Sequence, residues 1–251
     1  MEGKSIKVRQ TILGDGTPRI CVPVMAANRR ELDMQMRRVL ESPCDVIEWR
    51  ADVYRETEQE NWITETLTYL RMLAGDRPVL FTFRTKEEGG ERSASAEEYR
   101  AMNLEAASSG KADMVDLEWN RGSEYIREIA ALVQEKGVKV IGSFHDFGKT
   151  PTKERLLDII SGMQEIGVDI TKVAVMPRSE SDVLTLLDLS ITLKESVADR
   201  PYITMSMSRT GAVSRLCGAL TGSALTFATA GRASAPGQMD AEFVKSVLEV
   251  L

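Results

Sequence analysis

The feature that most constrains the fold is a pattern repeated along the whole chain: a short apolar run rich in β-branched residues, then an amphipathic stretch with helical periodicity. Strands that alternate with helices in this way form a parallel sheet, because each helix carries the chain back to the start of the next strand. We expect strands at residues 19–24, 44–49, 78–83, 113–119, 138–144, 171–176, 202–207 and 224–229.

Eight such units in 251 residues fit a (β/α)8 TIM barrel, which typically takes about 250 residues. The alternative is an open, doubly wound sheet, which would carry a glycine-rich phosphate turn after an early strand. The segment "PVMAANRRE" contains the end of the first expected strand and the residues after it, and it has no such turn. The sequence therefore favours an α/β protein in which residues 1–251 form a single (β/α)8 barrel domain.

Residues 1–18 precede the first strand–helix unit. Within them, residues 5–18 belong to a stretch in which apolar and polar positions alternate on both sides of a turn-forming "GDG". We interpret this segment as an N-terminal β-hairpin arm that closes the bottom of the barrel.

Composition excludes several classes of protein. The net charge of −6 argues against a nucleic-acid partner, which would favour a basic patch. No apolar run approaches the roughly 20 residues of a membrane helix, and the first ten residues lack the apolar core of a signal peptide, so we expect a cytoplasmic protein without a membrane partner. The three cysteines and the single histidine match neither a disulfide framework nor a metal-binding pattern.

Ionisable side chains recur on one face of five consecutive expected strands. Strand side chains alternate between two faces, and here the charged positions lie opposite the bulkiest apolar ones, so we expect them to point into the barrel. The residues are Glu48, Arg50, Asp52, Arg84, Asp116, Glu118, His145 and Lys172. Buried charges are costly unless they are paired, so one interpretation is a set of salt bridges that fills the barrel. Because several lie near strand C-terminal ends, where barrel enzymes keep their sites, an active site is the leading interpretation.

Lys172 is the most informative of these residues. An amine held in an apolar strand loses hydration, which favours its neutral form, and a neutral amine can add to a carbonyl and form a Schiff base. His145, the only histidine, lies on the preceding expected strand and would project into the same cavity as a general acid or base. Glu88, just past the third strand, could orient the imidazole or could be a solvated loop acid.

The last third of the chain adds candidate binding groups. It is dense in small residues, which let the backbone approach a ligand closely. Arg215 can hold a carboxylate with two parallel hydrogen bonds. Ser234 and Gln238 belong to the loop "SAPGQ", whose proline and glycine fix its shape.

With these residues identified, the chain resembles the type I 3-dehydroquinate dehydratases. The resemblance rests on six segments in the family's order and covers nearly the whole chain. They are "EWRAD" (48–52), "FTFRTKEEGG" (81–90), "SFHDFGKTP" (143–151), "KVAVMP" (172–177), "MSMSRTGAVSRLCG" (205–218) and "SAPGQ" (234–238). It implies a (β/α)8 barrel, usually a homodimer, that uses no metal and no organic cofactor.

The resemblance also implies an activity, the conversion of 3-dehydroquinate to 3-dehydroshikimate in the shikimate route to aromatic amino acids. Lys172 then matches the lysine that condenses with the substrate ketone. His145 matches the histidine that removes the C2 proton and protonates the departing hydroxyl in a syn elimination. Glu88 matches the acid partner of that histidine.

The remaining candidates match substrate-binding positions of the family. Glu48, Arg50 and Arg84 match groups around the ring hydroxyls. Arg215 matches the carboxylate clamp, and Ser234 and Gln238 belong to the loop that closes over the substrate. Two rival interpretations remain at this point: another Schiff-base barrel enzyme, such as an aldolase, and a non-catalytic barrel that binds a cyclic polyol acid.

Overall fold

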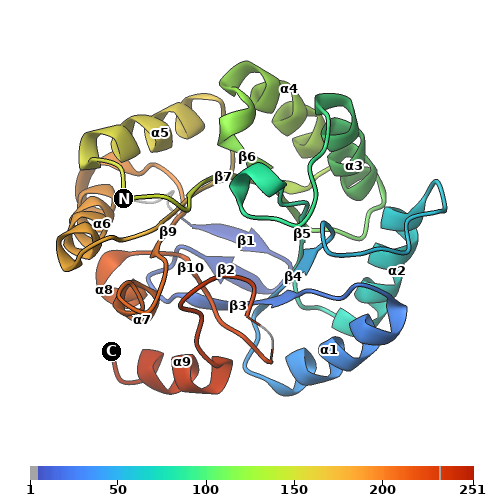
Figure 1. Ribbon diagram of the computed structural model, residues 1–251, viewed down its shortest axis with the longest axis horizontal. Coiled ribbons are helices and arrows are strands. Elements are labelled where there is room, and N and C mark those ends of the chain that lie inside the picture. The colour runs from blue at the N-terminus through green and yellow to red at the C-terminus, as the bar shows by residue number, and fades with distance from the viewer. Residues whose placement is uncertain (1–4, 232) are drawn as a thin grey trace.

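The computed structural model describes residues 5–231 and 233–251 and confirms the (β/α)8 barrel (Figure 1). Its eight parallel strands follow the order β10-β3-β4-β5-β6-β7-β8-β9. They are β3 (Arg19–Val24), β4 (Val46–Arg50), β5 (Val79–Thr82), β6 (Met114–Glu118), β7 (Lys139–Asp146), β8 (Ile170–Val175), β9 (Tyr202–Ser206) and β10 (Leu225–Phe227). The ends of the sheet meet where the Ala224 N–H donates to the Tyr202 carbonyl at 2.8 Å, so the barrel is nearly closed.

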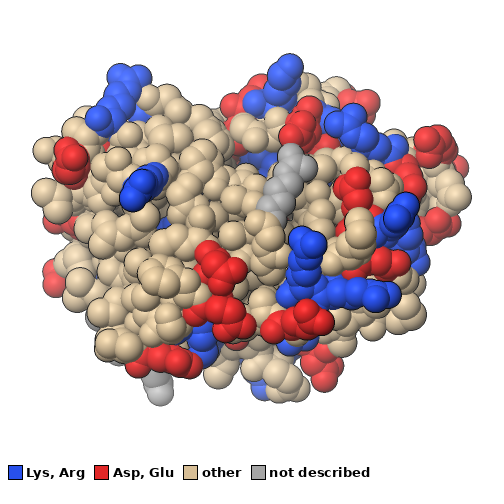
Figure 2. Space-filling model, turned by 60° about the horizontal axis from the view of Figure 1, so that its bottom comes forward, with Lys and Arg blue, Asp and Glu red and all other residues tan. Residues whose placement is uncertain are grey.

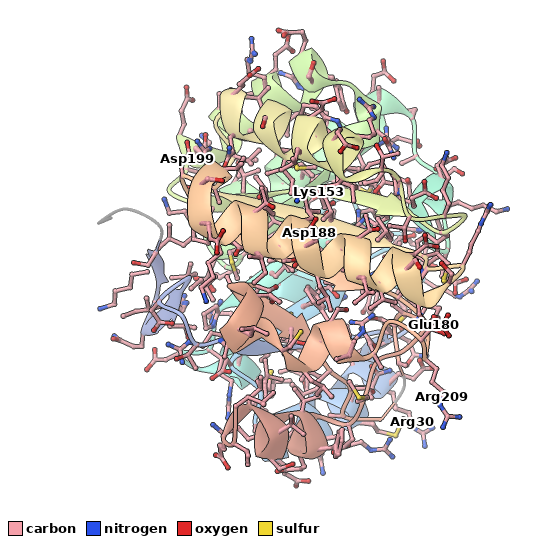
Figure 3. The ribbon with its side chains drawn as sticks, turned by 90° about the vertical axis from the view of Figure 1, so that its left-hand side faces the viewer. Arg30, Lys153, Glu180, Asp188, Asp199 and Arg209 are labelled. Carbon is pink, nitrogen blue, oxygen red and sulfur yellow. The ribbon has the colours of Figure 1, made fainter. Side chains whose placement is uncertain are left out.

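Helices surround the sheet (Figure 1). They are α1 (Arg29–Glu41), α2 (Trp62–Ala74), α3 (Ala96–Ser108), α4 (Ser123–Gln134), α5 (Lys153–Glu165), α6 (Glu180–Thr192), α7 (Val213–Leu216), α8 (Gly218–Thr221) and α9 (Ala241–Leu248). The structure also describes two 3-10 helices, η1 (Lys86–Glu88) and η2 (Trp119–Arg121), and a π-helical segment, η3 (Leu193–Val197). On the side seen in Figure 3, Lys153 of α5 and Asp188 of α6 form an ion pair at 2.7 Å. In the described part of the chain, no helix has the length and apolar character needed to span a bilayer.

Local sequence explains where several helices begin and end. Ser95 and Glu98 form a capping box at the start of α3, and Ser179 and Asp182 do the same for α6, so each pair satisfies backbone N–H groups that the helix leaves free. After α4, Gly137 adopts φ +78°, a conformation that favours glycine and turns the chain towards β7.

The hairpin arm is present, but its turn is not where the sequence suggested. Strand β1 (Ile6–Val8) pairs antiparallel with β2 (Thr11–Leu13), so the chain reverses at residues 9–10. Arg9 takes φ +53° in this turn, and its Nε donates to Asp113 at 2.6 Å, which anchors the turn beside the start of β6. The "GDG" at residues 14–16 instead links β2 to β3.

Each barrel strand divides its side chains between two cores. The outer core, between sheet and helices, contains Trp49, whose ring meets those of Tyr54 and Phe81 edge to face. The inner core fills the bottom of the barrel and contains Val8 and Leu13 of the hairpin. The hairpin therefore closes the bottom of the barrel, as the sequence predicted, and β1 and β2 lie across its centre in Figure 1.

The structure also shifts some predicted boundaries. Strand β7 extends to Asp146, two residues beyond the expected end, so His145 is held by the sheet rather than by a loop. The helix expected near 211–219 is two four-residue helices, α7 and α8. The strand fixes the direction of the imidazole, which points into the pocket as the alternation predicted.

The hairpin generates the first prediction. Leu13 is fully buried against the inner core, whereas its neighbour Ile12 is 40% exposed. We expect Leu13→Ala to lower the free energy of unfolding by about 2–5 kcal/mol, because it leaves a cavity at the bottom of the barrel. The matched control Ile12→Ala should change it by about 0.5 kcal/mol or less. Urea unfolding measures both, and equal effects would contradict the closing role of the hairpin.

Candidate active site

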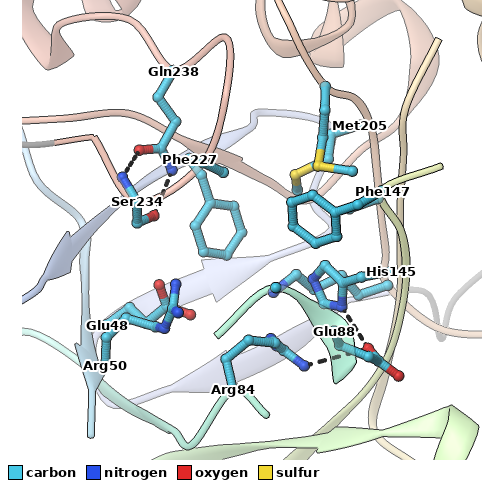
Figure 4. Close-up of a pocket in the computed structure, with 15 residues that line it drawn as sticks. Glu48, Arg50, Arg84, Glu88, His145, Phe147, Met205, Phe227, Ser234 and Gln238 are labelled. Carbon is cyan, nitrogen blue, oxygen red and sulfur yellow. Dashed lines mark hydrogen bonds and ion pairs between the residues drawn. The ribbon is translucent and has the colours of Figure 1, made fainter. Parts of the chain in front are cut away.

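A pocket opens at the C-terminal ends of the barrel strands (Figure 4). Most of the site residues expected from the sequence line it. They are Glu48, Arg50, Arg84, Glu88, His145, Lys172, Ser234 and Gln238. Arg215 does not line it and lies behind its wall. The pocket thus brings together side chains from three strands and two connecting segments that are far apart in the sequence.

Lys172 extends from the middle of β8 into this pocket, and its side chain is only 4% exposed. Its Nζ lies 3.1 Å from Asp116 Oδ2 and 4.6 Å from the centre of the Phe227 ring. The nitrogen thus donates to a carboxylate on one side and lies over an aromatic ring on the other. The lysine nitrogen is therefore held at a defined place in the pocket.

His145 lies on the neighbouring strand β7, and its Nδ1 is 2.9 Å from Glu88 Oε2. Burial, with the nearby charges of Arg84 and Lys172, holds the pKa of His145 well below its usual value. Burial likewise raises the pKa of Glu88 to about 8. The imidazole is therefore neutral near pH 7, with its Nδ1 directed at Glu88.

Arg84 is the centre of the charged network. Its guanidinium lies 2.6 Å from Asp116, 3.1 Å from Glu118 and 3.6 Å from Glu88. Burial alone would lower the pKa of Arg84, but these three carboxylates raise it well above its usual value. The arginine therefore stays charged and joins the acid beside the lysine to the acid beside the histidine.

The other wall of the pocket carries Glu48 and Arg50 of β4 (Figure 4). Arg50 donates from Nε and Nη2 to Asp52 at 2.8 and 2.9 Å, a bidentate pair. Glu48 Oε1 accepts the hydroxyl of Thr82 at 2.9 Å. Both side chains are thus fixed by protein partners.

The loop after β10 covers one edge of the pocket. Ser234 and Gln238 bind each other: the Ser234 N–H donates to Gln238 Oε1 at 2.7 Å, and Gln238 Nε2 donates to Ser234 Oγ at 2.9 Å. The Pro236 carbonyl accepts the Ser208 N–H at 3.2 Å, which joins the loop to the end of β9. Gly237, at φ +82°, lies so close to Ser208 that a Cβ would fall 2.2 Å from its carbonyl oxygen.

Arg215 of α7 is 2% exposed and meets only neutral groups among its described hydrogen-bond partners. Its guanidinium contacts the Met205 sulfur and the Phe227 and Pro236 carbonyls, while its Nε has no partner in the described part of the chain. Burial lowers its pKa to about 10. A buried guanidinium without a carboxylate partner, directly behind three pocket-lining segments, is suited to binding an anion.

Sequence reasoning left some pocket residues without a role. Phe147 lines the mouth, and its ring packs on Gly89 so closely that a Cβ there would lie 2.4 Å away. Phe227, Met205 and Met207 complete the apolar wall. The alternation of strands β9 and β10 was the available signal for these inward positions. In the described residues, no cluster of three or more His, Cys, Asp or Glu side chains is suited to a metal ion.

Comparisons with known proteins agree with this geometry. A family model described as type I 3-dehydroquinase matches residues 20–251. The chain is 44% identical over 249 residues to a 3-dehydroquinate dehydratase of Syntrophotalea carbinolica, covering 98% of each chain. It is 42% identical over 248 residues to one of Clostridioides difficile, covering 99% of this chain and 97% of that protein.

Solved structures give the same result. A type I 3-dehydroquinate dehydratase from Clostridium difficile, covalently modified with comenic acid, superposes with a TM-score of 0.95 at 42% identity, over 99% of this chain and 98% of that one. One from Geobacillus kaustophilus has a TM-score of 0.95 at 39% identity, over 99% and 96%. A 3-keto-L-gulonate-6-phosphate decarboxylase from Vibrio cholerae, 14% identical with a TM-score of 0.61, shares the fold alone.

The raised pKa of Glu88 should make the free energy of unfolding depend on pH. An unfolded glutamic acid loses its proton near pH 4.5, whereas the pKa of folded Glu88 is about 8. The folded state therefore binds more protons in this window, so this stabilisation is complete below the unfolded pKa and is lost as the pH rises through the folded pKa.

Glu88→Gln has the same shape and no titration. We expect the stability of the wild type relative to this variant to fall by about 1 kcal/mol per pH unit between about pH 5 and pH 8, then to level off. Urea unfolding at steps of one pH unit measures the difference. A constant difference over this range would show that Glu88 is ionised throughout.

Proposed function

The chain belongs to the type I 3-dehydroquinase family, and from this membership we propose that it eliminates water from 3-dehydroquinate to give 3-dehydroshikimate. One observation carries the proposal: the buried amine of Lys172 and the neutral imidazole of His145 face one pocket from adjacent strands. An amine in such a pocket forms a Schiff base with a ketone, and an imidazole beside it moves protons on the bound carbon skeleton.

In the proposed mechanism, Lys172 loses a proton and its nitrogen adds to the substrate ketone. The carbinolamine then loses water and leaves a protonated imine, whose positive nitrogen withdraws electrons from the neighbouring carbon. The hydrogen on that carbon becomes acidic, which makes its removal feasible for a base of modest strength. Because the lysine supplies this electron sink, the route uses neither a metal ion nor an organic cofactor.

His145 performs both proton transfers. It takes the C2 proton as the C–H electrons form the new double bond, and it then gives that proton to the hydroxyl that leaves as water. Since one imidazole acts at both positions, the proton and the hydroxyl leave from the same face of the ring, a syn elimination. A water molecule finally hydrolyses the imine, which releases the product and regenerates Lys172. Glu88 orients the imidazole through its contact with Nδ1.

The remaining residues bind the substrate. Arg215, which lacks a carboxylate partner among the described residues, takes the substrate carboxylate. Arg50 uses Nε and Nη2 for Asp52, and Glu48 uses Oε1 for Thr82. Among the residues that the structure describes, Arg50 Nη1 and Glu48 Oε2 have no hydrogen-bond partner, so they can bind ring hydroxyls.

Two further binding roles follow from the position of each group. Arg84 lies near the substrate ring hydroxyls in this proposal. Because it is paired with Glu88, Asp116 and Glu118, it contributes there chiefly a fixed positive charge. Ser234 and Gln238 close over the bound substrate with their loop.

The wider properties follow the family resemblance. We propose that residues 1–251 act as one domain, in the cytoplasm, in the shikimate route to aromatic amino acids, without a nucleic-acid or membrane partner. A homodimer is proposed too, and one face supports it. Leu184, Val213, Leu220 and Phe243 are 48–67% exposed on α6 to α9, and the left-hand side of Figure 2, where these helices lie, has few charged side chains.

The first functional prediction concerns the nucleophile. With 3-dehydroquinate and sodium borohydride, we expect a stable adduct on the peptide that contains Lys172, because borohydride reduces an imine to an amine. Lys172→Ala should fold normally, form no adduct and lose turnover, whereas the exposed-lysine control Lys136→Ala should retain both. Intact-protein mass spectrometry with peptide mapping and a dehydration assay are the measurements.

The same experiment separates the rivals. An adduct at Lys172 without any dehydration would favour an aldolase-type enzyme with another preferred substrate. Binding of 3-dehydroquinate without adduct or turnover would favour a non-catalytic binder. Either result would contradict the proposed function.

The second functional prediction concerns the carboxylate. Arg215→Ala removes a charged hydrogen-bonding group, so KM for 3-dehydroquinate should rise at least about tenfold with a smaller change in kcat. Arg155→Ala, which removes an exposed arginine on α5, is the control and should leave KM unchanged. Steady-state kinetics measure both variants, and an unaltered KM in the Arg215 variant would remove this residue from substrate binding.

A further inference from the structure

Asp116 is a buried acid with no role so far in the proposed mechanism. It lies on β6, its side chain is fully buried, and its two oxygens face different partners. Oδ1 accepts from Arg84 Nη2 at 2.6 Å and from Ser143 Oγ at 2.5 Å. Oδ2 accepts from Lys172 Nζ at 3.1 Å. One oxygen therefore fixes the carboxylate, and the other faces the lysine nitrogen.

We propose that Asp116 is a positioning residue that acts through Lys172: its Oδ2 holds the lysine nitrogen before reaction and accepts the one N–H that remains on the protonated imine. This inference rests on the proposed Schiff-base function. A single hydrogen bond from the imine N–H fixes the plane of the C=N bond. The nearby negative charge stabilises the positive nitrogen on which the elimination depends.

The number of protons on the Lys172 nitrogen at each step shows which of them Asp116 can accept as a hydrogen bond. The lysine ammonium carries three protons and gives up one to become a nucleophile. Addition to the ketone and departure of water leave one N–H on the imine, and Oδ2 is placed to accept it. Burial alone would raise the pKa of Asp116, but the charges of Arg84 and Lys172 lower it well below its usual value. The carboxylate thus remains an anion throughout and leaves the proton transfers to His145.

A purely structural role would apply equally to Glu118, which is a close match. Glu118 lies two residues further along β6, is 1% exposed and also binds Arg84, at 3.1 Å. Its oxygens bind Thr85 instead of the lysine, accepting the backbone N–H and the hydroxyl, each at 2.7 Å. Glu118 therefore lies on the same strand as Asp116, is equally buried and binds the same arginine, but it does not contact Lys172.

The test compares Asp116→Asn with Glu118→Gln. Each protein is treated with formaldehyde and dimethylamine–borane over a range of pH, and methylation of Lys172 is followed by peptide mapping, with surface lysines of the same digest as internal reference. This probe reports on the lysine amine without using 3-dehydroquinate. Loss of the neighbouring negative charge makes the ammonium easier to deprotonate, so the methylation profile of Asp116→Asn should move to lower pH by about one unit or more.

Glu118→Gln should move the profile by less than half as much, because Asp116 still faces the lysine. No movement in a folded Asp116→Asn protein, or an equal movement in both variants, would overturn the inference. If Asp116→Asn does not fold, Ser143→Ala takes its place, since it removes a donor to Oδ1 and keeps the carboxylate. With one donor to Oδ1 removed, the carboxylate holds the ammonium more strongly, so the Lys172 profile should move to higher pH relative to the surface reference. No movement, or movement to lower pH, would overturn the inference.

Turnover of 3-dehydroquinate supplies the second readout. Asp116→Asn should lower kcat by about 100-fold, with KM changed by less than about threefold, because the carboxylate acts on the imine and not on substrate binding. A change confined to KM would overturn the inference. If the wild type itself fails to dehydrate 3-dehydroquinate, the proposed function fails, while the methylation profiles still decide whether Asp116 controls the lysine.

Discussion

The barrel mouth depends on one buried guanidinium. Asp116, Glu118 and Glu88 come from β6 and the turn η1, and Arg84 contacts all three. Its positive charge lowers the pKa of Asp116, whereas burial still raises the pKa of Glu88 to about 8. The same charge also lowers the pKa of His145, so Arg84 keeps Asp116 ionised beside the lysine and helps to keep the imidazole neutral. The chemistry of the two groups is thus set by a residue that performs none of it.

Along strands such as β4, the residues that pack the inner core come before the residues that line the pocket. On β4, Val46 points into the apolar inner core, while Glu48 and Arg50, two and four residues later, line the pocket. The same change from apolar to charged occurs on β6 between Met114 and Asp116. The hairpin and lower strand residues fill the bottom of the barrel, so the upper residues can carry charge without being needed for packing.

Alternation in the sequence was enough to predict the barrel, the inward face of its charges and most of the pocket. It could not predict partners, because those depend on register: Ser143 faces Lys172 across β7 and β8 only through a pairing that no local pattern encodes. Nor could it predict that α7 holds Arg215 against Met205 and Phe227, because those contacts depend on how the helix packs on the barrel. The hairpin turn at residues 9–10 was missed because the "GDG" turn signal nearby is stronger.

The pairing of β10 with β3, which closes one side of the barrel, affects the order in which the protein can fold during synthesis. Strand β10 pairs with β3, so Leu225 lies beside Arg19, about 200 residues earlier in the chain. Contacts between such distant segments form late, since closing a long loop costs entropy before any contact offsets it. The loop with Ser234 and Gln238 follows this last strand. During synthesis on a ribosome, the lysine and the histidine therefore emerge well before the strand and the loop that complete the pocket around them.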